Sequence, residues 1–194
     1  MRATYLFGYG SLISAASRAL TGHTGPALPA RAGGLQRGWF APVPADRITY
    51  LGIRRAAGAT CNGVLFTIDE ASLPAFDARE KSHQRIAVPR ASVALLGAGA
   101  LEAGAIWSYE SVAPRPASDD IPLVQSYIDV IVDGCLTYGS AFAHELIAST
   151  AGWRAPWIDD RQHPRYPRHT PCLHGHAAID DALDAAGVLQ YRAS

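Results

Sequence analysis

The chain has 194 residues, with 17 basic and 17 acidic side chains and a formal net charge of zero. This length is enough for one domain with a substantial hydrophobic core. A nucleic-acid-binding protein needs a basic surplus to displace counterions, and a protein that binds anionic membranes needs one to bind lipid headgroups, so the balanced charge argues against both classes of partner.

The N-terminal segment has about five apolar residues before Gly8, which is too few for the core of a signal peptide. The sequence also contains no run near the roughly 20 apolar residues of a membrane span. Cys61, Cys135 and Cys172 form an odd set without close spacing, as is typical of proteins in a reducing compartment. We therefore expect a cytoplasmic protein.

Short strands dominate the first 111 residues. They are predicted at 4–8, 30–40, 48–54, 61–68, 84–88, 92–96 and 103–109. Pro42 is expected to end the second strand, and the turn Ala57-Gly58-Ala59 separates the third from the fourth. Short helices are predicted at 14–20 and from about Asp69 to Lys81, with Pro74 in an early turn. Many short strands with few helices predict a mostly antiparallel, curved sheet or a small barrel.

The remainder of the chain has a helical pattern. After a linker at 112–120, apolar residues recur with helical spacing over 121–150, with Pro122 in the first turn, and Gly134 and Gly139 can bend this helix or divide it. An irregular stretch at 153–168 follows, and a final helix at 179–186 is stopped by Gly187. We expect an α+β fold in a single domain, 1–194, with a small mixed, mostly antiparallel β-barrel core at about 1–111 and a helical C-terminal extension at about 119–194.

Two local features point to chemistry. The first strand runs directly into Tyr9-Gly10-Ser11-Leu12, where a glycine-broken loop leaves backbone N–H groups without a ladder partner, and such groups can bind an anion together. Glu80 lies between Arg79 and Lys81 at the end of the predicted helix. A carboxylate in that position, if it faces a pocket, can gain and lose a proton near neutral pH. An ordinary turn and a solvated helix end are the alternatives.

Together with Gly63-Val64-Leu65-Phe66, these residues resemble the γ-glutamylcyclotransferase-like superfamily, in particular its bacterial and AIG2-like members. The resemblance covers most of the chain, including the segments 32–39 and 157–161. It implies a mixed barrel with flanking helices and an enzyme that needs no cofactor. Such an enzyme cyclises the γ-glutamyl group of a small molecule to 5-oxoproline and releases an amine or amino acid.

The resemblance also implies roles for individual residues. Glu80 matches the glutamate that takes a proton from the substrate's α-ammonium group and returns one to the departing amine. The loop Tyr9, Gly10, Ser11 and Leu12 matches the segment that binds the α-carboxylate, with the Tyr9 ring as a wall. Relatives place a tyrosine three residues after the glutamate, whereas this chain has His83, and Ser82 stands where they have glycine. This departure bears on the identity of the substrate, which can be a γ-glutamyl amino acid, a γ-glutamyl amine or glutathione.

Other residues leave alternatives open. Tyr109 and Trp107 can frame the pocket or belong to the core. The segment Asp159-Asp160-Arg161 can form a lid, although we favour an internal ion pair that pins the tail to the barrel. The alternative to an enzyme is a binding protein. It would keep the fold and bind γ-glutamyl compounds or small anions without turnover, and His83 is the first indication of such a loss of activity.

A metal site can also be considered. Cys172, His174 and His176 would share one face of an extended segment and could together bind Zn²⁺. Structural zinc sites usually have four ligands in paired spacing, which this sequence lacks, so we expect no metal and no cofactor. The hydrolase, P-loop and dinucleotide-binding motifs are absent as well.

Overall fold

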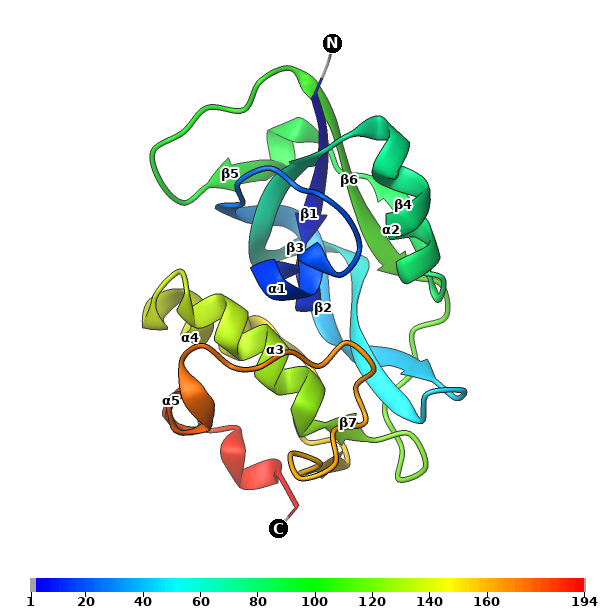
Figure 1. Ribbon diagram of the computed structural model, residues 1–194, viewed down its shortest axis with the longest axis vertical. Coiled ribbons are helices and arrows are strands. Elements are labelled where there is room, and N and C mark those ends of the chain that lie inside the picture. Colours follow the sequence, from blue (N-terminus) through cyan, green and yellow to red (C-terminus); the bar gives the residue numbers. More distant parts are fainter. Residues whose placement is uncertain (1–2, 194) are drawn as a thin grey trace.

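The protein was analysed as a computed structural model, which describes residues 3–193 (Figure 1). A six-stranded sheet has the order β4-β6-β1-β3-β2-β5. Its strands are β1 (Ala3–Gly8), β2 (Leu28–Val43), β3 (Ile48–Ile68), β4 (His83–Ala87), β5 (Val93–Leu95) and β6 (Gly104–Ser111). Neighbouring strands pair antiparallel except β1 and β6, which are parallel. The expected α+β class with a mixed, mostly antiparallel sheet is confirmed. Within residues 3–193 the two edge strands, β4 and β5, do not pair with each other, so closure into a barrel stays a prediction.

Helices surround this sheet. The N-terminal part contributes η1 (Ser11–Ile13), α1 (Ala15–Ala19), η2 (Glu70–Ser72), α2 (Leu73–Arg79) and η3 (Arg90–Ser92). The C-terminal part contributes β7 (Leu123–Val124), α3 (Gln125–Leu136), α4 (Ser140–Ser149), β8 (Trp157–Ile158), α5 (Gly175–Ala185) and η4 (Leu189–Tyr191). In Figure 1, α3, α4 and α5 gather near the end of the sheet where β1 stops. None of the helices described at 3–193 is long and apolar enough to cross a membrane.

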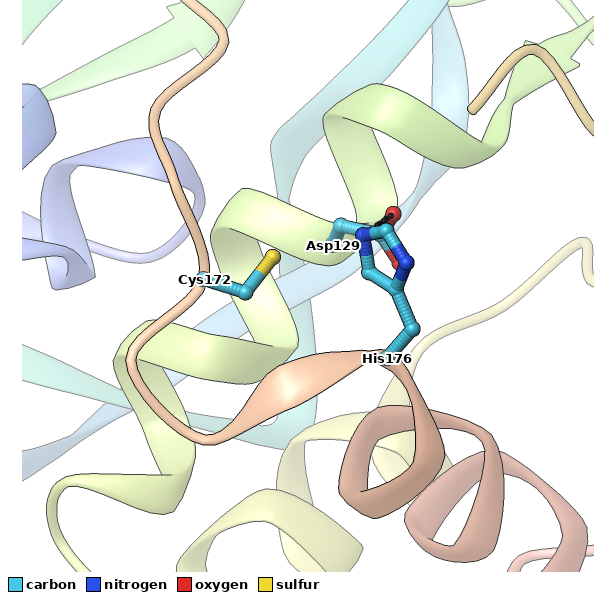
Figure 2. A group of neighbouring side chains, drawn as sticks. All are labelled: Asp129, Cys172 and His176. Carbon is cyan, nitrogen blue, oxygen red and sulfur yellow. Dashed lines mark ion pairs between the residues drawn. The ribbon is translucent and has the colours of Figure 1, made fainter. Parts of the chain in front are cut away.

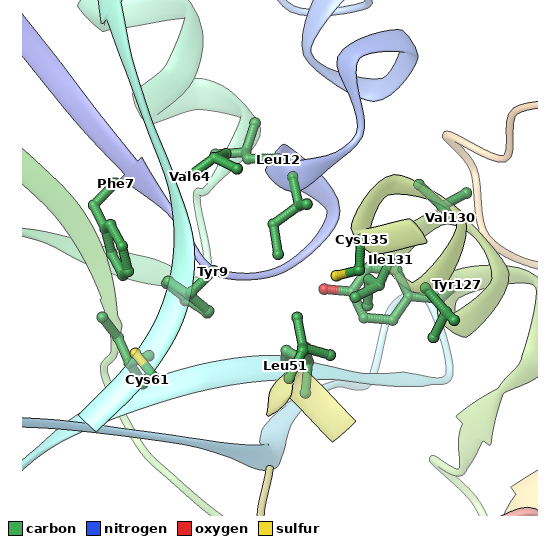
Figure 3. Packing of buried hydrophobic residues seen from close by; sticks show 14 of the residues in the cluster. Phe7, Tyr9, Leu12, Leu51, Cys61, Val64, Tyr127, Val130, Ile131 and Cys135 are labelled. Carbon is green, nitrogen blue, oxygen red and sulfur yellow. The ribbon is translucent and has the colours of Figure 1, made fainter. Parts of the chain in front are cut away.

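The hydrophobic core is continuous between the sheet and the C-terminal helices. Phe7 and Val64 from the sheet belong to the same buried cluster as Ile131 of α3 and Leu146 of α4. Figure 3 shows strand residues and α3 residues facing one another in this cluster. This continuity supports our proposal that the strand-rich and helical parts form one domain.

The long hairpin of β2 and β3 corrects two expectations. Pro42 does not end β2 but pairs opposite Thr49 of β3. Strand β5 pairs only with residues 30–32 of β2, so at Pro42 the other edge of β2 has no strand neighbour among the described residues and the missing N–H costs little. The turn at Ala57-Gly58-Ala59 does not divide β3 either. Instead, the register moves from Gly33 opposite Thr60 to Leu35 opposite Arg55, so residues 56–59 bulge out of one continuous strand.

The C-terminal helices differ in detail from the sequence pattern. We expected glycine either to bend the helical segment or to divide it. Gly139, which has a φ of 99°, lies between α3 and α4 and divides the segment. Pro122 does not lie in a first helical turn but precedes the short strand β7, and its carbonyl accepts a hydrogen bond from Thr49. The last helix begins at Gly175, earlier than expected, and ends before Gly187, as expected. The stretch expected to be irregular contains β8, which pairs with β7.

Candidate active site

A cavity of about 420 Å³ opens where β1 ends and α2 stops. Every site residue proposed from the sequence lines it: Tyr9, Gly10, Ser11, Leu12, Glu80, His83 and Tyr109. Further lining residues come from the hairpin, from α3 and from the C-terminal segment: Asp46, Tyr50, Tyr127, Tyr166 and Arg168. The sequence order hides this arrangement, because the lining residues come from six separated parts of the chain.

The loop Tyr9–Leu12 folds back tightly after β1. A Cβ atom at Gly8 would lie 2.7 Å from the Cβ of Leu12, so glycine is required for this close approach. Among the hydrogen bonds of residues 3–193, none uses the amide N–H of Gly10, Ser11 or Leu12 as a donor. Because these residues line the cavity, their N–H groups can bind an anion that enters it.

Glu80 caps the C-terminal end of α2, and backbone hydrogen bonds hold it on both sides. Its N–H donates to the carbonyl of Phe76 (3.0 Å), and its carbonyl accepts from the N–H of His83 (2.7 Å). The carboxylate is 18% exposed; Oε1 lies 3.2 Å from Arg79 Nε and Oε2 lies 3.7 Å from His83 Nδ1. Glu80 thus combines a fixed backbone with a carboxylate that a molecule in the cavity can reach.

Arg79 joins the two chemical features of the cavity. Its buried guanidinium donates to the Ser11 hydroxyl (3.0 Å) of the loop and to Oε1 of Glu80. It also donates to the carbonyl and hydroxyl of Ser17 and to the hydroxyl of Thr21, at 2.7–2.8 Å. Sequence reasoning treated Arg79 only as a cation beside Glu80 and missed this linking role, since its partners lie 58 to 68 positions away.

Three phenols surround Glu80. Burial raises the pKa of Tyr9, Tyr109 and Tyr127, and the negative charge of Glu80 raises it further, so all three stay uncharged at physiological pH. Tyr9 donates to the carbonyl of Tyr109 (2.6 Å), and Tyr109 donates to Asp77 (3.0 Å). The Tyr9 and Tyr109 hydroxyls are therefore bound to the protein, and their rings form cavity wall.

Solved structures share this arrangement of strands and helices. A protein described as gamma-glutamyl cyclotransferase is 17% identical over 72% of this chain and 86% of its own, with a TM-score of 0.54. An uncharacterized protein from Homo sapiens is 17% identical over 73% of this chain and 87% of its own, with a TM-score of 0.56. This chain has the γ-glutamyl cyclotransferase-like fold. YkqA from Bacillus subtilis is similar too, at 17% identity and a TM-score of 0.53, over 71% of this chain and 49% of its own.

Sequence comparison gives no further assignment, because no family model and no curated protein matches the chain. At 17% identity the likeness concerns the γ-glutamyl cyclotransferase-like fold alone. The roles of individual residues therefore rest on the geometry of the cavity in this chain.

His83 marks where this chain departs from the sequence pattern of γ-glutamyl cyclotransferase-like proteins. Its side chain is only 4% exposed, and its Nδ1 lies 3.2 Å from the Ser82 hydroxyl. Its Nε2 is buried and has no hydrogen-bond partner among the described atoms. The imidazole is packed beside Glu80 and leaves the carboxylate of Glu80 accessible. Trp107 does not line the cavity; Arg85 lies over its ring, 5.1 Å from the centroid.

An aromatic wall of the cavity, which reaches Gly10 of the loop through Tyr127, was missed at the sequence level. The ring centroid of Tyr127 lies 4.9 Å from that of Tyr50 and 4.8 Å from that of Tyr166, so the three rings pack together. Tyr50 donates to Asp46 (2.8 Å) at the edge of this wall. The helical pattern of 121–150 includes Tyr127, but nothing local to Tyr50 or Tyr166 indicates that the three rings meet.

The segment Asp159-Asp160-Arg161 does not line the cavity, so it forms no lid. The ion pairing that we favoured is present, but it joins the segment to helices and not to the barrel. Arg161 pairs with Asp129 of α3 and Asp180 of α5, both at 2.8 Å. Asp160 accepts a hydrogen bond from the N–H of Ser126 at 2.7 Å. These contacts pin the segment to the helices that cover one end of the sheet.

The three residues considered for a metal do not come together. Gly175 has a φ of 79° and starts α5, so the chain is not extended from Cys172 to His176 and the shared face is lost. His174 Nδ1 lies 3.0 Å from Asp133. Cys172 and His176 instead lie beside Asp129.

Proposed function

We propose that the protein cyclises the γ-glutamyl group of a small-molecule substrate to 5-oxoproline and releases an amine or amino acid. One observation carries this proposal. The same cavity holds an accessible carboxylate, Glu80, and a loop whose amide N–H groups at Gly10, Ser11 and Leu12 have no acceptor within residues 3–193. A substrate with an α-carboxylate and an α-ammonium group needs this combination of an anion site and a proton acceptor.

The reaction follows from these two features. The loop N–H groups bind the α-carboxylate, and Glu80 takes a proton from the α-ammonium group. The freed amine attacks the γ-carbonyl carbon, so a C–N bond forms within the substrate and closes the five-membered ring. The original amide C–N bond then breaks as Glu80 gives the proton to the departing amine. The ring nitrogen, which still carries two protons after the attack, gives one of them to solvent, and the released amine takes one up to become an ammonium ion. The protons therefore balance, and the reaction requires no cofactor.

Positioning supplies much of the rate enhancement, because the attack is intramolecular and a correctly folded substrate has a large kinetic advantage. Arg79 holds the Ser11 hydroxyl and the Glu80 carboxylate in a fixed relation, which keeps the anion site and the base at a constant separation. The side of the cavity lined by Tyr50, Tyr166 and Arg168 is left for the departing amine.

The proposal is tested by measuring 5-oxoproline release from γ-glutamyl-alanine, γ-glutamyl-ε-lysine and glutathione. We expect the wild type to convert at least one substrate and Glu80→Gln to be slower by about 10²–10⁴-fold, the usual contribution of a general acid/base. Glu70→Gln is the matched control, because Glu70 is exposed in η2 and does not line the cavity. Equal rates for Glu80→Gln and the wild type would refute the role of Glu80.

A binding protein without turnover is the second candidate, and the buried His83 in place of the relatives' tyrosine is the observation that favours it. In that case calorimetry would detect binding of the same γ-glutamyl compounds, and no 5-oxoproline would form. We further propose a cytoplasmic location, which is supported by the three free cysteines.

A further inference from the structure

Three potential metal ligands meet on the far side of α3 from the sheet. Asp129 lies in α3, Cys172 in the segment before α5, and His176 in the first turn of α5 (Figure 2). One donor atom from each, a carboxylate oxygen, a sulfur and an imidazole nitrogen, lies within 4.8 Å of the other two. The Nε2 atom of His176 is 3.8 Å from Oδ2 of Asp129.

This donor set suits a borderline-soft divalent ion. Sulfur and imidazole nitrogen favour Zn²⁺ over Mg²⁺ or Ca²⁺, which prefer oxygen ligands. Tetrahedral zinc with bonds of about 2.0–2.3 Å places its ligand atoms roughly 3.5 Å apart, so the donors have to move closer by about 1 Å. Cys172 lies on a loop and the His176 side chain is 52% exposed, so both can make this movement.

Asp129 can accept a cation without losing its present partners. Its Oδ1 accepts from Gln125 (2.7 Å) and from Nη2 of Arg161 (2.8 Å), whereas Oδ2 accepts only from Nε of Arg161 (2.9 Å) among the described groups. One lone pair of Oδ2, the oxygen nearest His176, is therefore available. Gln125 and Arg161 would fix the carboxylate as an outer layer of hydrogen bonds around the metal.

The surroundings carry more negative than positive charge. Asp129, Asp133, Asp159 and Asp180 share this region with two guanidinium groups, Arg161 and Arg192, which leaves a surplus of two carboxylates. A divalent cation would balance the surplus.

We propose that Asp129, Cys172 and His176 bind one divalent ion of the Zn²⁺ type, with solvent in the fourth position. On binding, the S–H bond of Cys172 breaks, its proton leaves to solvent and a sulfur–metal bond forms, with no change of oxidation state. The ion joins the segment 159–174 and α5 to α3. Because Tyr166 and Arg168 of that segment and Tyr127 of α3 line the cavity, the ion would stabilise one cavity wall.

The full chain, without a histidine tag, is titrated with Co²⁺ while the thiolate-to-metal charge-transfer absorption is recorded, and with Zn²⁺ by calorimetry. We expect one ion per chain and a higher melting temperature with Zn²⁺. Cys172→Ala abolishes the charge-transfer absorption, and both Cys172→Ala and His176→Ala weaken Zn²⁺ binding by at least about tenfold. The matched control is His163→Ala, because His163 is exposed and outside the cluster, and it leaves binding unchanged.

The proposal is overturned if no ion binds stoichiometrically, or if the affinity and absorption of Cys172→Ala equal those of the wild type. A measurement on the wild type covers the case in which a variant does not fold. Zn²⁺ is expected to slow alkylation of Cys172 relative to the metal-free chain, as followed by peptide mass spectrometry. Alkylation of Cys172 at an unchanged rate with Zn²⁺ present also rules out the site.

Discussion

Arg37 and Arg79 are both buried arginines that join distant parts of the chain, yet their partners differ in kind. Arg37 is fully buried, and within residues 3–193 its acceptors are all neutral: the carbonyls of Tyr9, Asn62 and Leu146, the amide oxygen of Asn62, and the hydroxyls of Ser149 and Thr150. Arg79 donates to carbonyl and hydroxyl groups too, but one of its partners, Glu80, is ionisable and lines the cavity.

The chemical nature of the acceptors distinguishes a structural arginine, Arg37, from an arginine at a candidate active site, Arg79. Burial lowers the pKa of Arg37, and carbonyls such as that of Leu146, near the negative end of the α4 dipole, offset part of that cost. All its hydrogen bonds stay inside the protein, so they stabilise the junction of sheet and helices. The bond from Arg79 to Glu80 instead fixes a group whose proton can move.

Arg37→Met has the largest expected effect. The substitution leaves several buried acceptors unsatisfied, at about 1–3 kcal/mol each, so the free energy of unfolding should fall by roughly 3–6 kcal/mol. The corresponding loss in melting temperature is about 10 °C or more, measurable by calorimetry. Arg31→Met in the same strand removes only a half-exposed ion pair with Glu145 and should cost less than about 1 kcal/mol. Equal stability of the two variants would contradict a structural role for Arg37.

Arg79→Lys tests whether Arg79 supports activity as well as stability. Lysine keeps the positive charge but cannot donate to Ser11, Ser17 and Glu80 at once. We expect kcat/KM for 5-oxoproline release to fall by about 10–100-fold, or roughly 1.4–2.7 kcal/mol, with a smaller loss of stability than in Arg37→Met. The control is Arg55→Lys, the same exchange at an exposed strand residue beside the bulge. If Arg79→Lys lost stability but kept full kcat/KM, Arg79 would belong with Arg37.

Gly10→Ala probes the loop that Arg79 holds. The new Cβ would lie 3.2 Å from the Tyr127 hydroxyl, so the loop or the ring has to shift by a few tenths of an ångström. We expect KM to rise by about tenfold, roughly 1.4 kcal/mol, with kcat less affected, as determined by steady-state kinetics. Gly97→Ala meets no atom within 4 Å and should behave like the wild type. An unchanged KM in Gly10→Ala would argue against binding at this loop.

The smallest expected effect concerns a third arginine, Arg161, which unlike Arg37 has two carboxylate partners. Burial raises the pKa of Asp180, but hydrogen bonds from Arg161 and Arg192 outweigh it, and the net shift is downward. A pKa lower in the folded state stabilises the fold above the unfolded value of about 3.9, and this contribution is lost as the pH falls through the folded value.

Asp180→Asn should therefore be less stable than the wild type at pH 7. The difference between them should shrink once the pH falls below about 4. Urea unfolding at a series of pH values measures this difference, with Asp181→Asn, on an exposed neighbour, as the control. A difference that stayed constant down to pH 2 would mean that the charge of Asp180 does not stabilise the fold.

Local features of the sequence predicted β1, α2 and the loop between Tyr9 and Leu12. A strand that stops at Gly8 and a helix with Pro74 in its first turn are encoded within a few residues, and Glu80 follows the helix directly. The bulge at 56–59 was read as a turn because the same residues suit both, and only the pairing with β2 distinguishes them.

Contacts between distant segments could not be predicted. The helical pattern of 121–150 includes Tyr127 but does not show that this residue approaches Gly10, because its neighbours depend on how α3 packs on the sheet. The same holds for Arg79, whose acceptors in α1 become neighbours only after folding.

The position of β1 also has a consequence for how the chain folds as it is synthesised. Residues 3–8 lie inside the sheet, hydrogen-bonded to β3 on one side and, in parallel, to residues 104–107 on the other. At about 5–20 residues per second, a ribosome needs roughly 5–20 s to produce the second partner after the first strand. Until then one edge of β1 is without its native neighbour, so the emerging chain passes through a stage in which an apolar strand is open to pairing with other chains.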